Sequence, residues 1–297
     1  MSWFEGFNDG LFEVNGTQIF ARYGGDRGKP PLLLLHGFPQ THAIWHRVAQ
    51  QLREDFFLVM PDLRGYGDSR KEPGLADHSN NSKRAMAADM AALMAMLRFD
   101  QFFVCAHDRG GRVAHRLALD HPTLVKKMCL LDIAPTLDMY EGTSMDFARL
   151  YYHWFLLIQP APLPETMIGN NTRTMLHVML GGWGAGGLNY IEPHALAEYD
   201  RCFCRAESIH AVCEDYRASA GIDLDHDRES RSRGEKILCD LLVQCGERAL
   251  VHRLFDPLAL WQRQCSGTVE YRAVPAGHFI PEELPLETAT TLRGYFA

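Results

Sequence analysis

Asp108 is the residue whose surroundings most clearly indicate chemistry. It follows the apolar run 102–106 and His107, and the small residues Ala106 and Gly110 stand two positions before and after it. A residue flanked in this way between a strand and a helix is exposed on a sharp turn, the nucleophile elbow, whose crowded backbone needs small neighbours. An aspartate at that point can displace a leaving group from saturated carbon, forming an ester that water must later open.

Two arginines after Asp108 oppose the usual charge preference of a helix. Arg109 and Arg112 fall in the first turn of the expected helix, where the positive end of the dipole disfavours cations by about 0.3–1 kcal/mol. At positions i and i+3 they share one helix face. They therefore indicate a clamp for a second carboxylate, with ion pairs to other elements as the alternative. The same cations and the helix N-terminus are expected to lower the pKa of Asp108.

A base for the water is expected near the C-terminus. His278 follows the apolar run 269–274 on a loop, and loops at the carboxyl ends of such strands reach the crevice where α/β sheets bind ligands. A neutral imidazole near pH 7 can activate water when a buried acid orients it. Asp132, Glu247 and Asp256 are the candidate acids. An acid inside an apolar strand end is costly unless it is paired, which favours Asp132.

The elements that must position these residues follow from hydrophobic periodicity. Asn15-Gly16 separates two short runs and predicts a hairpin. Continuous apolar runs, typical of strands covered on both faces, alternate with amphipathic helical patterns at 86–97 and 113–118. The strands expected from these runs span residues 12–14, 18–22, 32–35, 56–60, 102–106, 128–133, 238–245 and 269–274.

The alternation stops between residue 136 and residue 234, where no strand run is found. Helical patterns occur there near 147–158, 194–203 and 208–219, and the charge-rich run 223–236 reads as a solvated segment leading back to the core. The sequence therefore predicts an α/β fold with a mostly parallel central sheet flanked by helices, and an inserted all-helical cap. The expected core comprises 1–135 and 235–297, and the expected cap comprises 136–234.

Composition limits the classes of partner and compartment. The 297 residues suffice for about two domains, and 46% apolar with 23% charged residues is typical of a globular protein. The net charge of −7 gives no general attraction for nucleic acid or an anionic membrane. No apolar run approaches a membrane span, the N-terminus lacks a secretion signal, and eight cysteines without a staple pattern indicate reduced thiols. We expect a cytoplasmic protein.

Several motifs, in the right order along nearly the whole chain, resemble those of a known family. The Asp108 elbow, His36-Gly37-Phe38-Pro39 and Gly277-His278-Phe279 together resemble the aspartate-nucleophile α/β-hydrolases, the group containing haloalkane dehalogenases and epoxide hydrolases. Within that group, the fluoroacetate dehalogenases are the nearest match to three segments: Asp108-Arg109-Gly110-Gly111-Arg112, His153-Trp154 and Glu214-Asp215-Tyr216-Arg217.

The resemblance implies a role for each candidate residue. Asp108 would be the nucleophile, His278 the base and Asp132 its orienting acid, with Asp256 next in line. The remaining groups would be Arg109 and Arg112 for the substrate carboxylate, His153, Trp154 and Tyr216 for the halide, the Phe38 N–H for an oxyanion, and Trp183 as a pocket wall. Without the resemblance, His153, Trp154 and Tyr216 would be read as packing residues of cap helices. The resemblance implies no metal or organic cofactor. It does imply a homodimer that forms through the cap.

The reading that follows is a haloacetate dehalogenase, with fluoroacetate as the expected substrate and glycolate as the product. Two alternatives stay open. An epoxide hydrolase would use the same nucleophile and base with cap tyrosines such as Tyr216 and either Tyr151 or Tyr152, but an epoxide gives two arginines no anion to bind. A non-catalytic binding protein could retain the fold, since fold alone does not fix function.

Overall fold

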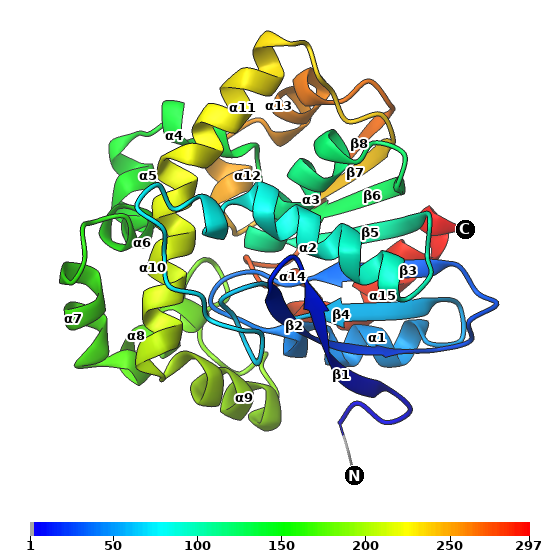
Figure 1. Cartoon of the computed structure of the whole chain (residues 1–297), viewed down its shortest axis with the longest axis horizontal. Coiled ribbons are helices and arrows are strands. Elements are labelled where there is room, and N and C mark those ends of the chain that lie inside the picture. The colour runs from blue at the N-terminus through cyan, green and yellow to red at the C-terminus, as the bar shows by residue number, and fades with distance from the viewer. Residues whose placement is uncertain (1–2) are drawn as a thin grey trace.

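The computed structural model describes residues 3–297 (Figure 1). Eight strands in that range form one sheet in the order β1-β2-β4-β3-β5-β6-β7-β8, in which β2 pairs antiparallel with both neighbours and every other pairing is parallel. This confirms the mostly parallel sheet. The strands are β1 (Asn8–Val14), β2 (Thr17–Gly24), β3 (Pro31–Leu35), β4 (Phe57–Pro61), β5 (Phe102–His107), β6 (Val125–Leu131), β7 (Asp240–Gly246) and β8 (Val269–Val274).

Local sequence explains where these strands form. Asn15 and Gly16 take positive φ angles of 48° and 77°, the backbone of a tight hairpin turn between β1 and β2. Every residue of β4 and β5 is buried, as are Leu32–Leu35 of β3. Strands covered on both faces need continuous apolar sequence, which is the signal that predicted them.

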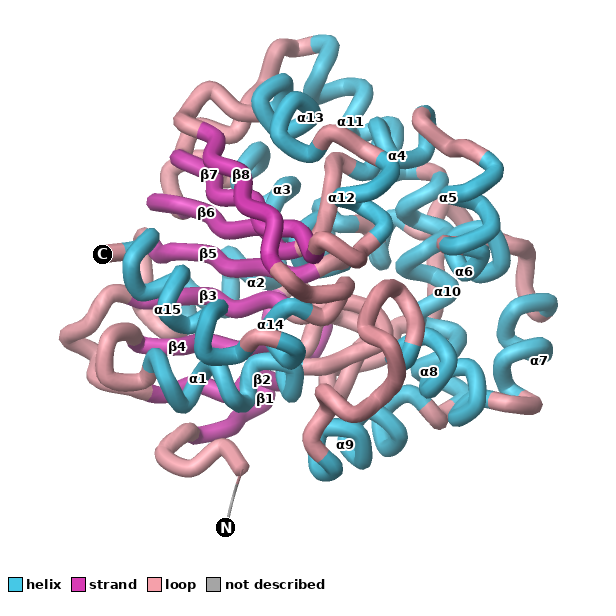
Figure 2. Tube along the Cα trace, turned by 180° about the vertical axis from the view of Figure 1, so that it is seen from behind, coloured by secondary structure: helices cyan, strands magenta, loops and turns pink. Residues whose placement is uncertain are grey.

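Helices cover both faces of the sheet. α1 and α15 pack on one face through buried residues such as Val48, Leu52 and Leu292, and Figure 2 shows them in front of the strands. On the opposite face, α2, α3 and α13 contribute Met90, Leu117 and other core residues. The elements outside the sheet in this part are η1 (His42–Trp45), α1 (His46–Leu52), η2 (Ser79–Asn81), α2 (Lys83–Met96), α3 (Arg109–Asp120), α12 (Leu250–Leu254), α13 (Pro257–Gln264), α14 (Ile280–Glu283) and α15 (Pro285–Phe296).

A group of helices is inserted between β6 and β7, and both views place most of it beyond one end of the strands (Figures 1 and 2). We call them the cap helices: α4 (Thr136–Glu141), α5 (Met145–Leu150), α6 (Tyr152–Leu157), α7 (Leu163–Gly169), α8 (Thr172–Gly181), α9 (Pro193–Phe203), α10 (Ala206–Ala220) and α11 (Ile222–Ser232). The expectation for 223–236 was wrong in one respect, because most of that run is helix α11 with Asp223 and Asp227 buried.

A helix that spans a membrane needs a certain length and hydropathy. Across residues 3–297, no helix combines the length and apolar character needed to cross a bilayer.

Candidate active site

Four segments carrying candidate residues converge at one edge of the sheet. Phe38 follows β3, Asp108 follows β5 and Asp132 follows β6, while His278 lies on the loop after β8. The carboxyl ends of parallel strands meet at the same edge, which brings these segments together although they are far apart in sequence. The cap helices lie over this edge (Figure 1).

Asp108 has the strained backbone of the predicted elbow. Its φ of 46° and ψ of −114° lie outside the regions that most L-residues adopt, between the last residue of β5 and the first of α3. The surroundings admit no extra atoms: a Cβ on Gly37 would lie 2.5 Å from Asp108 Cβ, and one on Gly110 would lie 2.3 Å from the His36 carbonyl oxygen. Both glycines are therefore needed for this turn.

The two carboxylate oxygens of Asp108 have different partners. Oδ1 accepts a hydrogen bond from the Phe38 N–H at 2.9 Å, whereas Oδ2 lies 3.8 Å from His278 Nε2. Burial by itself would raise the pKa of Asp108, but the nearby His278, His107 and two arginines outweigh it and lower that pKa. Asp108 is therefore ionised near neutral pH, with one oxygen held and the other facing the imidazole.

Asp132 is the acid that meets His278. Its Oδ2 lies 2.6 Å from His278 Nδ1, and its Oδ1 accepts from the Gly246 N–H. Asp256 instead is exposed and caps α13 by accepting from the Ala259 N–H. Burial opposes the charged imidazole, but the hydrogen bond and charge of Asp132, together with the charge of Asp108, raise the pKa of His278.

Arg109 is fully buried and makes an ion pair that the sequence did not specify. Its Nε and Nη2 donate to the two carboxylate oxygens of Asp215 at 2.9 and 2.8 Å, and Nη2 also donates to Ser219 Oγ at 2.7 Å. Among the described residues, Nη1 has no hydrogen-bond partner. Arg109 thus combines the two readings of the sequence: it forms an inter-element ion pair and keeps one nitrogen free for an anion.

Arg112 is held differently and also keeps one nitrogen free. Nη1 donates to Thr136 Oγ1 at 2.9 Å and to the Ala134 carbonyl oxygen at 3.3 Å, on the segment that leads into the cap helices. Its buried Nε finds no acceptor within residues 3–297. The two arginines together therefore offer one unpaired N–H nitrogen each beside Asp108.

Three cap side chains present buried polar atoms that have no partner in the described part of the chain. These atoms are His153 Nδ1, Trp154 Nε1 and the Tyr216 hydroxyl. Buried polar atoms are normally paired, so three orphans together need an explanation. Burial lowers the pKa of His153 to about 3, so its ring is neutral and carries one N–H.

The cap rings and the arginines are arranged in pairs. Arg109 Cζ lies 4.1 Å from the centre of the Tyr216 ring, and Arg112 Cζ lies 4.7 Å from the Trp154 ring. Phe38 packs against His153 and Tyr216, with ring centres 5.7 and 5.3 Å apart. The three cap side chains therefore pack against the two arginines and Phe38, next to the elbow.

Trp183 packs against two of the candidate residues. Its ring centre lies 4.6 Å from that of His153 and 5.4 Å from that of His278, and its carbonyl oxygen accepts from the His278 N–H at 3.0 Å. Trp183 lies in the glycine-rich loop after α8 with a positive φ of 51°. It also fixes the backbone of the histidine.

Sequence reasoning missed the groups that hold Arg109. Asp215 and Ser219 lie on α10, and Asp215 also receives Tyr66 Oη at 2.6 Å and the ammonium of Lys83. The resemblance includes the segment 214–217, but it implies a role for Tyr216 alone. The sequence does contain a signal for this pair: Asp215 is an acidic residue next to Tyr216, and Arg109 needs a counter-charge.

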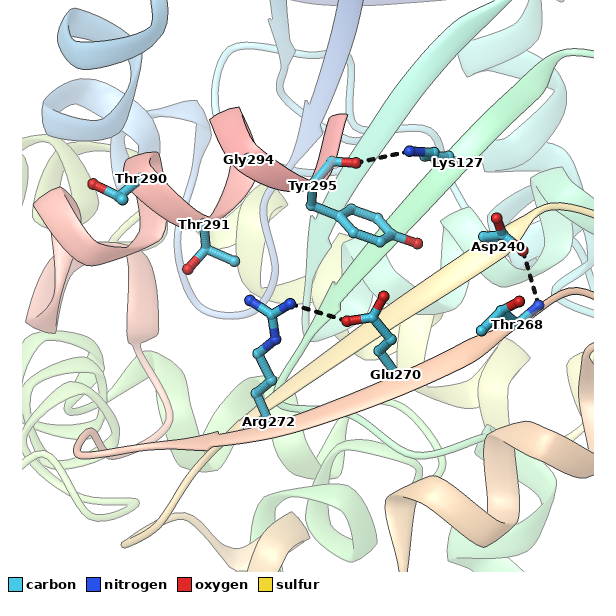
Figure 3. A pocket seen from close by; sticks show the side chains of 9 residues that line it. All are labelled: Lys127, Asp240, Thr268, Glu270, Arg272, Thr290, Thr291, Gly294 and Tyr295. Atoms are coloured by element: carbon cyan, nitrogen blue, oxygen red, sulfur yellow. Dashed lines mark hydrogen bonds and ion pairs between the residues drawn. The ribbon is translucent and has the colours of Figure 1, made fainter. Parts of the chain in front are cut away.

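Open hollows on the surface lie elsewhere. One of about 590 Å³ is found near the amino ends of β6, β7 and β8, with Lys127, Asp240 and Arg272 among its lining residues (Figure 3). Its charges are mixed, and Arg272 pairs with Glu270 inside it. None of the candidate residues lines this hollow, so accessibility alone would have pointed to the wrong end of the strands.

The arrangement at the carboxyl ends can perform two linked steps. A fixed carboxylate facing a histidine is suited to displacement at carbon followed by hydrolysis of the resulting ester. Within residues 3–297, no group of three or more His, Cys, Asp or Glu side chains is placed to hold a metal ion.

Comparisons with known proteins show the fold family of the chain and several similar proteins. The model of the α/β hydrolase fold family matches residues 30–284. A fluoroacetate dehalogenase from Burkholderia sp. is 42% identical over 294 residues, which cover 99% of this chain and 95% of the relative. A soluble epoxide hydrolase from Corynebacterium sp. (strain C12) is 32% identical over 90% of each chain. A solved α/β hydrolase structure from Nostoc sp. PCC 7120 superposes with a TM-score of 0.95 at 47% identity, covering 99% of both chains.

Proposed function

The chain belongs to the α/β-hydrolase fold family, and we propose that it is a hydrolytic dehalogenase converting fluoroacetate, or a related haloacetate, to glycolate and halide. One observation carries this proposal: the carboxylate of Asp108 lies near two buried arginines and three cap side chains, each of which has a buried polar atom without a partner in residues 3–297. A small molecule with a carboxylate at one end and a halogen at the other matches both sets. The Burkholderia relative supports the same substrate class.

In the first step, Arg109 Nη1 and Arg112 Nε bind the substrate carboxylate and align the adjacent carbon with Asp108. Oδ2 of Asp108 attacks that carbon, so an O–C bond forms while the C–halogen bond breaks and its electron pair leaves with the halide. Positioning of this kind lowers the barrier because the reacting atoms are already oriented. Oδ1 stays with the Phe38 N–H throughout.

The halide leaves toward the cap helices. His153, Trp154 and Tyr216 donate hydrogen bonds to it, each worth about 1.5–3 kcal/mol to an ionic acceptor. Only the part that grows as charge builds on the halogen accelerates the step. Fluoride is a strongly basic leaving group, so three donors that have no other partner suit it especially well.

In the second step, His278 takes a proton from water, and the resulting hydroxide attacks the carbonyl carbon of the Asp108 ester. Negative charge develops on Oδ1, where the N–H of Phe38 stabilises it, with the Arg109 backbone N–H as the expected second donor. The tetrahedral adduct then collapses: the bond between the carbonyl carbon and Oδ2 breaks, the leaving glycolate oxygen takes the proton from His278, and the Asp108 carboxylate is regenerated with one oxygen from water. Ester formation removes the Asp108 charge, one of the contributions that raise the pKa of His278. The imidazole therefore becomes easier to use as a neutral base once the ester exists.

The decisive test is fluoride release from fluoroacetate, followed with a fluoride electrode. We expect turnover by the native protein. In Asp108→Asn, the rate of fluoride release should fall by about 10⁴-fold or more, because little catalysis is left without the nucleophile. Asp256→Asn, which changes an exposed carboxylate outside the site, is the matched control and retains turnover. Diol formation from a styrene-type epoxide without fluoride release would favour an epoxide hydrolase instead, and inactivity toward both would favour a binding protein.

We further propose that residues 136–234 act as a cap domain over a core of 1–135 and 235–297, and that two copies associate through the cap. The cap helices α6, α7 and α8 expose Tyr152, Met167 and Val178 around an apolar hollow of about 530 Å³. Contiguous apolar surface of this kind is typical of protein interfaces. Sedimentation of native protein and Val178→Asp tests this, and a native monomer contradicts it.

A cytoplasmic location accompanies this function. All eight cysteines are free thiols, most of them buried. Free cysteines in this number fit a reducing compartment.

A further inference from the structure

The guanidinium of Arg109 is fixed on every side except one. Nε and Nη2 bind the two oxygens of Asp215, Nη2 also contacts the Asp215 carbonyl and Ser219 Oγ, and the Tyr216 ring covers the guanidinium face at 4.1 Å. In the described chain only Nη1 is without a partner. A two-point carboxylate pair sets the plane of a guanidinium, so the direction of Nη1 is determined by Asp215.

Asp215 is itself the meeting point of three donors from the core. Tyr66 Oη donates to it at 2.6 Å, Arg109 binds both of its oxygens, and the buried ammonium of Lys83 contacts Oδ1. Lys83 also lies 3.8 Å from Asp223 Oδ2, and its backbone N–H donates to Asp223 Oδ1. Asp215, though carried by cap helix α10, is thus held by residues of the core.

The charges in this cluster balance. Lys83 shares Asp215 with Arg109, and with Asp223 the cluster holds two cations and two carboxylates. Each buried ion therefore has a counter-charge, and the guanidinium of Arg109 is held in place while its Nη1 has no partner among the described residues.

We propose that Asp215 and Lys83 are positioning residues for the substrate carboxylate: Asp215 aims Arg109 Nη1 into the site, and Lys83 holds the Asp215 carboxylate in place. This inference rests on the proposed function. Asp215 is also the neighbour of Tyr216, so one turn of α10 orients the nitrogen for the carboxylate and supplies a donor for the halide. α10 thereby sets the distance between the group that binds the carboxylate and a group that binds the halide.

The test compares chloroacetate with chloroacetamide, which has the same leaving group and no negative charge. In Asp215→Asn and Lys83→Met, we expect KM for chloroacetate to rise about tenfold, the loss of one charge-assisted contact, with kcat changed much less. With chloroacetamide, KM and kcat of both variants stay within about threefold of the native values, a variation that is usual when one contact is changed. The double variant is no worse than the poorer single variant, because Lys83 acts through Asp215.

Glu165→Gln is the matched control, since Glu165 is a cap carboxylate that pairs with Arg217 and does not contact Arg109. It leaves both substrates unchanged. If Asp215→Asn does not fold, Tyr66→Phe removes a single donor to Asp215 and is expected to raise KM for chloroacetate alone, by about threefold for one neutral hydrogen bond. Equal losses on both substrates in a folded variant would show a merely structural role and overturn the proposal.

A binding measurement separates this inference from the proposed function. Acetate titrated calorimetrically into native protein and variants reports the carboxylate site without any turnover. Weaker acetate binding in Asp215→Asn and Lys83→Met supports the positioning role even if no halide is released from any substrate. Unchanged acetate affinity in both folded variants contradicts it, whatever the activity.

Discussion

Two core carboxylates, those of Asp108 and Asp132, differ from the side chains of the cap helices in how their polar atoms are paired at the same site. On the core side, Asp132 is bonded to His278, and Asp108 accepts from the Phe38 N–H. On the cap side, polar atoms of His153, Trp154 and Tyr216 are buried with no partner in the described structure. Groups that must hold one geometry before substrate arrives are paired within the protein, whereas donors whose acceptor is created during the reaction are left open.

This difference has an energetic side. A buried donor without an acceptor costs about 1–3 kcal/mol, whereas a paired one is roughly neutral or stabilising. The cap side therefore gives up stability for function, as active sites commonly do. Variants in the two regions should respond differently, both in the step that fails and in the stability of the protein.

The largest effect is expected from the core base. In His278→Asn, Asp108 can still displace halide, but no base activates water for the ester. Halide is then released once per site, and the Asp108 ester of glycolate accumulates, visible by intact mass. A variant that turns over repeatedly would show that His278 is not the base, and unmodified protein after a halide burst would argue against an ester.

The next effect concerns the acid that holds this base. Asp132 raises the pKa of His278, and the imidazole acts as a base only when neutral, so activity falls as the pH drops through that pKa. Asp132→Asn should therefore move the acid limb of kcat to lower pH while lowering the plateau by about 10²–10⁴-fold, because the ring loses its orientation. An acid limb that stays in place or moves upward would contradict the assignment.

The smallest effect is expected on the cap side. Tyr216→Phe removes one open hydroxyl, so kcat should fall by about 10²-fold with fluoroacetate and by less with chloroacetate, whose leaving group needs less help. The free energy of unfolding should stay level or rise by up to about 1 kcal/mol. Urea unfolding and halide release measure the two quantities.

Tyr190 provides the matched comparison within the cap region. Its hydroxyl donates to the Leu180 carbonyl oxygen at 2.8 Å. Tyr190→Phe should therefore lose about 1 kcal/mol of stability and keep its leaving-group preference. Equal stability losses in Tyr190→Phe and Tyr216→Phe would mean that the Tyr216 hydroxyl has a partner in the folded protein.

The residues of the core side were largely predictable from sequence. Apolar runs locate the strands, and strand ends in a parallel sheet converge, so Asp108, Asp132 and His278 could be grouped before any coordinates. The elbow itself follows from small residues at fixed offsets from Asp108. Such features depend on local sequence and on one general rule of topology.

The support behind Arg109 could not be predicted in the same way. Its partner Asp215 is 106 positions away on a helix whose orientation depends on cap packing. Lys83 begins α2 and has no local feature that distinguishes it from a solvated lysine. The charge pattern of α11 likewise suggests a solvated segment. Asp223 of that helix is buried because it accepts a hydrogen bond from the backbone N–H of Lys83, which is distant in sequence.

The insertion of the cap between β6 and β7 has a consequence for how this chain can vary. These two strands are adjacent in the sheet, so every residue of the cap belongs to one long loop that folding must close. The entropy of closing a loop grows only logarithmically, by about 0.6 kcal/mol for each doubling of its length. Relatives can therefore lengthen or shorten the cap, and with it the shape of the ligand space, at almost no cost in the folding of the sheet that carries the nucleophile.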